Sequence, residues 1–278
     1  MTGRAELAAF LRARREALRP EDVGLGRGPR RRAEGLRREE VAALSHMSAD
    51  YYTRIEQNRG PQPSPAMLAA IAQGLHLSLD ERDHVFRLAG HRAPERGPSG
   101  GHISPGLLRI FDRLHDTPAE IVSELGETLR QTPLGVALSG PLTDFQGEQR
   151  SIGFRWFTDP GARLRYAPED RDALGRVFVA NLRRVAGLRG PASRAAHYAE
   201  ALQERSAEFR ALWDEGQVAT PPEAVKRFLH PEVGLIELTC QRLIDPDQSH
   251  ALLVYTAAPG SESQDKLDLL AVIAAAGV

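Results

Sequence analysis

The residues best suited to chemistry lie close together between Ser48 and Arg59, where hydrogen-bonding and cationic side chains alternate with apolar ones. Arginine can donate two parallel hydrogen bonds to a guanine edge, and aspartate can accept one from a cytosine amine. Hydroxyl groups and further cations suit backbone phosphates. This combination predicts contact with a nucleic acid. The candidate contact residues in this stretch are Ser48, Ala49, Asp50, Tyr51, Arg54 and Arg59.

Each of these side chains has an expected role. Ser48 suits a helix N-cap, beside which backbone N–H groups can meet a phosphate. Ala49 could contact a thymine methyl group, and Arg54 is the preferred candidate for a guanine contact. Two alternatives stay open: Asp50 could stabilise only the helix dipole, and Arg54 could pair with Asp50 four residues earlier. Tyr51 and Arg59 suit phosphate contacts.

More cations precede this stretch. Arg38 is a further candidate contact and is expected at the start of the preceding helix. A loop carries three consecutive arginines that could reach a phosphate or a minor groove, or could form a solvated loop; they are Arg30, Arg31 and Arg32. Residues 1–97 hold 17 arginines and 13 acidic residues, a net charge of +4, whereas the remainder carries −5. A polyanionic partner is therefore expected for the first part of the chain only.

No combination of residues indicates an enzyme. His230 and Glu232 resemble the His-x-Glu of zinc deaminases, but the Pro-Cys-x-x-Cys partner is missing. G-x-S-x-G, H-E-x-x-H and phosphate-loop motifs are also missing. Cys240 is the single cysteine of 278 residues, which excludes an internal disulfide and a metal site with several thiolate ligands. We expect no catalytic residues, cofactor or metal. His230 is expected to make a structural hydrogen bond in a turn.

Hydrophobic periodicity predicts five helices that would position the candidate contacts. Apolar side chains recur at helical spacing in the first, and the fourth and fifth begin at serine caps. Two short helices follow each other with only a tight turn between them, which is typical of a helix-turn-helix. The predicted helices span Ala5–Leu18, Arg38–Ser45 and Ser48–Gln57, then begin at Ser64 and at Ser78.

The run from Leu36 to Gly90, which contains DYYTRIEQNRG and ERDHVFRLAG, resembles the Xre-type helix-turn-helix family and its MmyB-like branch. Later segments, including FRWFTDPGAR and LLVYTAAPGSES, resemble the MmyB-like ligand-binding domain. The resemblance implies a bacterial DNA-binding regulator with a PAS-like second domain for an apolar small molecule. Two departures stand out: His46 replaces the usual turn glycine, and Arg37 replaces a capping threonine. Histidine tolerates positive φ at small strain.

The second half of the chain reads as α+β. Two strands are expected within Glu120–Thr132, and two more at Leu235–Ile244 and Ala251–Thr256. Long helices are expected over Ala167–Leu188 and Arg194–Trp213. Within the third strand, alternation places Ile236, Leu238, Cys240 and Ile244 on one face, so Cys240 is expected to be a buried small apolar residue.

A sheet with helices against one face leaves room for an apolar cavity, the usual place for a ligand. Aromatic side chains are the candidate walls, although such residues are more often ordinary core. The candidates are Phe154, Phe157, Phe209, Trp213 and Phe228.

The expected architecture is mostly α with a second α+β domain: a five-helix helix-turn-helix bundle followed by a PAS-like antiparallel sheet with helices. We expect the DNA-binding domain at 1–92, a Gly- and Pro-rich linker at 93–105 and the second domain at 106–278. The expected partners are a double-stranded DNA operator, a second copy and an apolar, fatty-acid-like effector. In the alternative, the second domain only dimerises or binds a protein. The sequence lacks a signal peptide and any apolar run of about 18 residues, so we expect a cytoplasmic location and no membrane partner.

Overall fold

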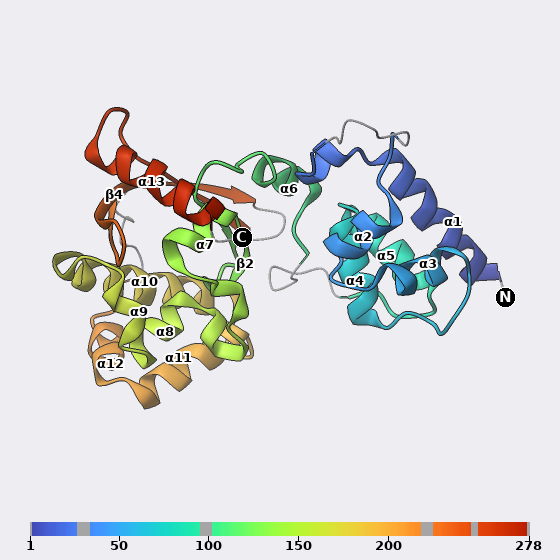
Figure 1. The fold of residues 1–278 in the computed structure, drawn as a ribbon. Coiled ribbons are helices and arrows are strands. Elements are labelled where there is room, and N and C mark those ends of the chain that lie inside the picture. Colours follow the sequence, from blue (N-terminus) through green and yellow to red (C-terminus); the bar gives the residue numbers. More distant parts are fainter. Residues whose placement is uncertain (1, 27–33, 95–101, 218–224, 246–249, 277–278) are drawn as a thin grey trace. The chain divides into compact units, whose positions relative to one another are not determined.

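The computed structural model describes residues 2–26, 34–94, 102–217, 225–245 and 250–276 (Figure 1). The chain divides into two compact units, Met1–Arg113 and Leu114–Val278, which are described in turn.

The first unit contains the five predicted helices. Serine caps begin several of these helices. Ser64 accepts a hydrogen bond from the Met67 N–H. Ser78 accepts one from the Glu81 N–H, and the Glu81 carboxylate accepts one from the Ser78 N–H. The helices and one 3₁₀ turn are α1 (Thr2–Ala17), η1 (Pro20–Val23), α2 (Arg38–Leu44), α3 (Ala49–Glu56), α4 (Pro65–Gly74) and α5 (Leu79–Leu88).

One apolar core joins these helices. The predicted inward positions of α1, α2 and α3 are buried, including Leu11, Val41 and Tyr52. At Gly74, in the last turn of α4, an added Cβ would lie 2.5 Å from Ser45 Oγ, so only glycine allows this helix to approach the α2–α3 turn so closely. The bundle thus holds α2 and α3 in a fixed relation.

A sixth helix, α6 (Pro105–Phe111), also belongs to the first unit. Leu108 and Phe111 are buried, and the backbone N–H of Ile103, just before the helix, donates to Gln73 Oε1 at 2.9 Å. The buried His102 ring lies 2.8 Å from the carbonyl oxygen of Leu77. Within the expected linker 93–105, residues 95–101 lie outside the described residues, and 102–104 pack on the helical bundle.

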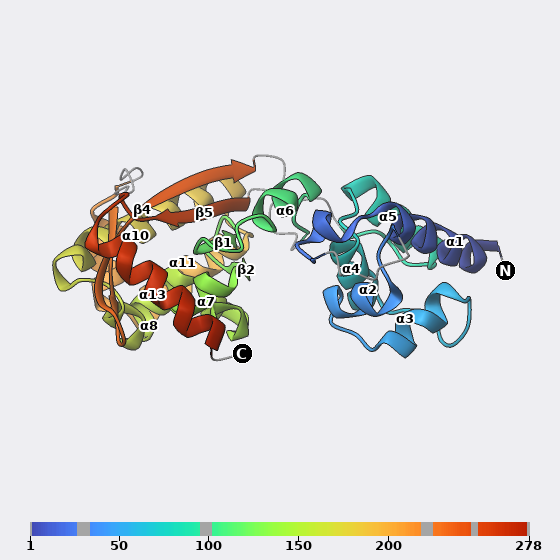
Figure 2. The same cartoon turned by 45° about the horizontal axis from the view of Figure 1, so that its top comes forward.

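The second unit is built on a five-stranded antiparallel sheet of order β2-β1-β5-β4-β3. The long neighbours β4 and β5 run side by side in Figure 2. The strands are β1 (Ala119–Val122), β2 (Thr128–Gln131), β3 (Val225–His230), β4 (Gly234–Asp245) and β5 (His250–Thr256).

Helices and 3₁₀ turns complete this unit, which confirms the predicted α+β class. The aromatic cluster of α8 and the inner faces of α10 and α11 form a single core with Ile236 and Leu238 of the sheet. The elements are α7 (Pro133–Ser139), η2 (Leu142–Asp144), η3 (Gly147–Arg150), α8 (Ile152–Thr158), α9 (Gly161–Leu164), η4 (Pro168–Asp170), α10 (Arg171–Arg189), α11 (Arg194–Arg205), α12 (Ala207–Asp214) and α13 (Glu262–Ala276).

Several details of this unit differ from the sequence prediction. The stretch Arg194–Trp213 forms two helices, because Ser206 leaves the helical conformation and caps α12 by accepting from the Phe209 N–H. The helix predicted from Ala167 begins at Arg171, since Ala167 donates its N–H to the Arg227 carbonyl of β3 instead. Ile244 is 63% exposed rather than buried, because no described element covers this end of β4.

Candidate DNA interface and ligand cavity

Helix α3 presents one face to solvent and buries the other. Ser48 is its N-cap, as predicted, and accepts a hydrogen bond of 3.2 Å from the Tyr51 N–H. Tyr52 and Ile55 are buried, whereas Ala49 and Asp50 are exposed. The first turn of the helix is therefore free to enter a groove, which is the arrangement that reading of base edges requires.

The turn before α3 has the predicted strained residue. His46 has φ +52°, and its N–H donates to the Ala43 carbonyl, while the Met47 N–H donates to Ala42. The imidazole is exposed. The turn thus closes with histidine, where the sequence resemblance implies glycine, and the histidine adopts a left-handed backbone conformation.

The two candidate base-reading side chains contact each other. Arg54 Nη2 lies 2.5 Å from Asp50 Oδ2, the pairing at i, i+4 that the sequence left open. Both side chains are well exposed, at 57% and 70%. An exposed pair of this kind contributes only a few tenths of a kcal/mol. A stronger partner could therefore displace it.

Arg38 is partly exposed but is bound to a buried carboxylate. Its Nε donates to Glu56 Oε2 at 3.1 Å, and Arg15 binds the same carboxylate at 2.6 Å. The Glu56 side chain is fully buried, and Arg12 also lies within 3.3 Å of it. Burial raises the pKa of Glu56, but the hydrogen bonds and charges of Arg15 and Arg38 outweigh it and hold the pKa below its ordinary value. Arg38 thus joins α2 to the end of α3.

A shallow hollow beside α3 contains a cation that the sequence reasoning missed. Arg37 lines it together with Arg38, Ala49 and Thr53. Arg37 is exposed, and its place directly before Arg38 was the available signal. Arg59 is also exposed, at the end of α3. The predicted contacts Arg30, Arg31 and Arg32 lie outside the described residues.

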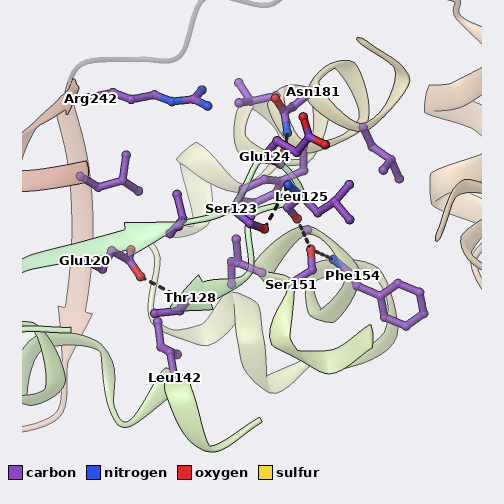
Figure 3. A pocket seen from close by; sticks show the side chains of 18 of the residues that line it. Glu120, Ser123, Glu124, Leu125, Thr128, Leu142, Ser151, Phe154, Asn181 and Arg242 are labelled. Carbon is purple, nitrogen blue, oxygen red and sulfur yellow. Dashed lines mark hydrogen bonds between the residues drawn. The ribbon is translucent and has the colours of Figure 1, made fainter. Parts of the chain in front are cut away.

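The second unit encloses a cavity of about 360 Å³ between the sheet and the helices α8, α10 and α11 (Figure 3). Most of its wall is apolar. The apolar and aromatic residues that line it are Val122, Leu125, Leu142, Ile152, Phe154, Phe157, Tyr166, Val177, Phe178, Leu182, Tyr198, Leu202, Phe209, Leu253 and Tyr255.

Three of the five predicted wall residues line this cavity: Phe154, Phe157 and Phe209. Trp213 stacks on Phe209 with ring centroids 5.4 Å apart and lies behind the wall. Phe228 is only 2% exposed and packs against the rings of Tyr166 and Tyr255 within the core. Aromatic character alone could not separate residues of the cavity wall from those packed behind it.

Polar groups occur at a few places in the wall. Glu120 accepts hydrogen bonds from Tyr255 Oη at 2.8 Å and Thr128 Oγ1 at 3.0 Å. Burial, together with Glu120, raises the pKa of Tyr255 well above its ordinary value. Asn181 and Arg242 also line the cavity, and Asn181 donates to the Glu124 carbonyl. The sequence did not indicate Glu120, Asn181 and Arg242 as wall residues, because they lie on separate strands and helices and follow no shared spacing.

Behind the wall, Glu127 is 4% exposed and binds Arg194 at 2.5 Å. It also accepts a hydrogen bond from Tyr198 Oη at 3.1 Å. Burial and the Glu127 charge raise the pKa of Tyr198 to about 12, so this hydroxyl remains a donor near neutral pH. The network fixes β2 to α11.

His230 has the structural surroundings expected of it, whereas Cys240, expected to be buried, is only partly buried. Cys240 is partly buried at the cavity wall, and burial raises the pKa of its thiol. The His230 ring lies 3.0 Å from the Ala137 carbonyl and accepts from the Glu232 N–H in the β3–β4 turn. Among the described residues, no cluster of three or more His, Cys, Asp or Glu side chains could hold a metal ion. None of the described helices is long and apolar enough to cross a membrane.

Comparison with known protein families agrees with this geometry. Residues 6–85 match the helix-turn-helix domain model, and residues 103–270 match the model of the MmyB-like transcription regulator ligand binding domain. Both are regulator domains. Comparison with curated proteins returns no match. The second family model covers more than half of the chain, so the chain belongs to the MmyB-like transcription regulators, DNA-binding proteins that join a helix-turn-helix domain to a ligand-binding domain.

Proposed function

We propose that this regulator acts in the cytoplasm as a homodimer that binds a specific operator through α3, and that an apolar, fatty-acid-like effector in the cavity controls this binding. A single helix reads only one half-site, so two copies would read a site with two-fold symmetry.

For the DNA half, the exposed first turn of α3 carries the proposal. Ala49, Asp50 and Arg54 would face base edges, while Ser48, Tyr51 and Arg59 would bind phosphates. Arg54 is half of an exposed ion pair, so a guanine edge can compete for its guanidinium. Arg38 would support DNA binding by holding α2 against α3 through its hydrogen bond to Glu56. Of these two arginines, the exposed Arg37 is the better candidate for a phosphate contact. Arg30, Arg31 and Arg32 remain candidates for a basic arm.

The main observation that supports the effector proposal is the cavity itself. Its volume of about 360 Å³ lies in the range of small-molecule sites, which are mostly apolar with a few placed polar groups. A core that needed only to be stable would be packed without such a space, because protein interiors are close-packed. Phe154, Phe157 and Phe209 would contact the effector.

Two experiments test these halves separately. Selection of binding sequences from random DNA, followed by footprinting of the best site, should give two symmetric half-sites about one helical turn apart. Failure to enrich any sequence would contradict the operator proposal.

Native mass spectrometry of the purified full chain should show a bound molecule that is released on denaturation. If the protein has only the mass of the polypeptide and binds no apolar probe, the effector proposal is contradicted.

One observation favours the alternative in which the second domain only dimerises or binds a protein. Leu269, Val272 and Ile273 form an exposed apolar stripe along α13, at 52%, 66% and 36% exposure. Apolar stripes of this kind are typical of association surfaces. If Val272→Asp abolishes dimers and DNA binding while no probe enters the cavity, the alternative replaces the effector proposal.

A further inference from the structure

Helix α12 leaves α11 at a bend that the local sequence does not favour. The stretch Arg194–Trp213 contains neither glycine nor proline and is rich in alanine, glutamate and arginine, which favour one continuous helix. Ser206 instead has φ −133° and ψ 116°, an extended conformation, and its side chain caps α12. Tertiary contacts must therefore hold the bend, because the local preference is for a straight helix.

The bend brings one side chain of α12 into the cavity wall. Tyr198 and Leu202 of α11 line the cavity, and so does Phe209 of α12. In a continuous helix, Phe209 would share a face with these two residues but would lie about 10 Å beyond Leu202 along the axis. The bend turns α12 instead, so that the Phe209 ring meets Phe157 of α8 with centroids 5.2 Å apart.

Few buried contacts hold α12 in this position. Among the residues of α12, all of which the structure describes, only Phe209 is buried, while Leu212 and Trp213 are partly buried. Exposed ion pairs contribute little to stability, and a helix with few buried contacts belongs to the less stable parts of a fold. The other contacts of α12 come from arginines of α9 and α10: Arg163 to Glu208, Arg176 to Glu215 and Arg183 to Trp213.

We infer that α12 is a hinged cover of the cavity. In the closed state, Phe209 completes the wall. In the open state, Ser206 becomes helical, α11 and α12 join in one helix, and the Phe209 ring leaves the cavity. A molecule in the cavity contacts this ring only in the closed state, so it favours that state. This inference rests on the proposed function, because it describes how the same cavity opens and how its occupancy changes the conformation.

Two substitutions shift the hinge in opposite directions. Ala207→Pro places proline at the first position of α12, where it is tolerated, and disfavours a helical Ser206, so it holds the closed state. Ser206→Ala removes the cap and favours the continuous helix, so it populates the open state. Neither of these two described residues lines the cavity. Ser193→Ala removes the corresponding serine cap of α11 and is the matched control.

The first measurement is the exchange of a neutral apolar fluorophore, N-phenyl-1-naphthylamine, by stopped flow on the full-length protein. Ala207→Pro should slow both entry and release by about tenfold or more, since proline excludes the continuous helix. Ser206→Ala should speed both by about fivefold, the equivalent of one lost cap. Ser193→Ala should leave both rates unchanged. A merely structural role of the cap would not give opposite changes of rate in the first two variants.

The second measurement needs no bound molecule. Of the two tryptophans, Trp156 is buried in the core and Trp213 lies on α12, so quenching of the fluorescence by acrylamide reports mainly on Trp213. Quenching should increase in Ser206→Ala. It should return to the wild-type value in the double variant Ser206→Ala/Ala207→Pro, because proline prevents the helix from straightening.

The outcomes separate this inference from the proposed function. Equal quenching in all variants, or exchange rates that Ala207→Pro leaves unchanged or raises, overturns the hinge while a bound fluorophore still supports the effector proposal. If the fluorophore does not bind to wild type and no molecule co-purifies, the effector proposal falls. The quenching measurement then decides by itself whether α12 opens.

Discussion

The Nε2 atom of His76 lies 3.4 Å from Oδ2 of Asp112, and both side chains are at least nine-tenths buried. This contact joins the turn after α4 to the end of α6. Gly24 packs against the same aspartate, because a Cβ there would lie 3.3 Å from the Asp112 Cβ. Helix α6 is therefore bound to the first unit as far as Asp112, two residues before the second unit begins at Leu114.

Replacing Asp112 by alanine should loosen this attachment. The change removes a buried carboxylate that contacts His76, and leaving a buried polar group without its partner costs about 1–3 kcal/mol. In the full chain, hydrogen exchange of the α6 amides should become faster by the corresponding factor, while the amides of β4 and β5 keep their protection. Asp116→Ala, at an exposed position nearby, is the control. Unchanged α6 protection in Asp112→Ala would show that apolar packing alone holds the helix.

Removing the charge of Glu56 should destabilise the first unit strongly. Glu56→Gln removes the buried counter-ion of Arg15 and leaves it only the exposed carboxylate of Glu16, and breaking a buried ion pair costs about 3–5 kcal/mol. Both tryptophans, Trp156 and Trp213, lie in the second unit. In urea, the helical circular dichroism signal of the variant should therefore fall at lower urea concentration than in wild type. The midpoint of the tryptophan fluorescence transition should stay unchanged. The control Glu39→Gln, at an exposed site of α2, should leave both transitions unchanged.

The same carboxylate makes the first unit sensitive to acid. Its pKa is lowered in the folded state, so its contribution is present above the unfolded pKa of about 4.3 and is lost as pH falls through the folded value. The stability difference between wild type and Glu56→Gln should thus be full at pH 7 and shrink progressively below about pH 4. Urea titrations at pH 7, 5, 4 and 3 measure it. A difference that stayed constant with pH would show that the carboxylate charge contributes nothing.

His46→Gly should stabilise the helix-turn-helix. The left-handed backbone at φ +52° costs a non-glycine residue about 1–2 kcal/mol, and the added freedom of the unfolded glycine offsets up to about 1 kcal/mol. A net gain of roughly 0.5–1 kcal/mol should appear as a higher melting temperature in circular dichroism. Ala43→Gly, at an exposed position within α2, should instead lower it. A melting temperature reduced by His46→Gly would mean that the imidazole makes a stabilising contact.

Arg54→Ala should weaken operator binding by about 1–3 kcal/mol and relax specificity at one base pair. Asp50→Ala removes its ion-pair partner, so this variant should keep that specificity if Arg54 reads the base. Arg87→Ala removes an exposed cation of α5 and controls for net charge. Binding to a panel of operators mutated one base pair at a time measures all three. Equal profiles for wild type and Arg54→Ala would leave Arg54 as a partner of Asp50 only.

Local rules were enough to predict helices α1 to α5 of the first unit and four of the five strands of the sheet. Serine caps at 48, 64 and 78 and the spacing of apolar residues act within one helical turn, so they can be read without the fold. The positive φ of His46 follows from the tight turn between two helices. By contrast, α6, β3 and α13 were not anticipated, although β3 pairs with β4, the next strand along the chain.

The sequence by itself determined that the chain carries a helix-turn-helix whose second helix exposes Ala49, Asp50 and Arg54, because helical periodicity decides which side chains share a face. Only the tertiary structure decided what those and other polar groups contact. Glu56 is buried because Arg15, 41 residues earlier, neutralises it. Glu120, Asn181 and Arg242 reach one cavity because the sheet order places β1 and β4 on either side of β5. Such long-range pairings leave no period in the sequence.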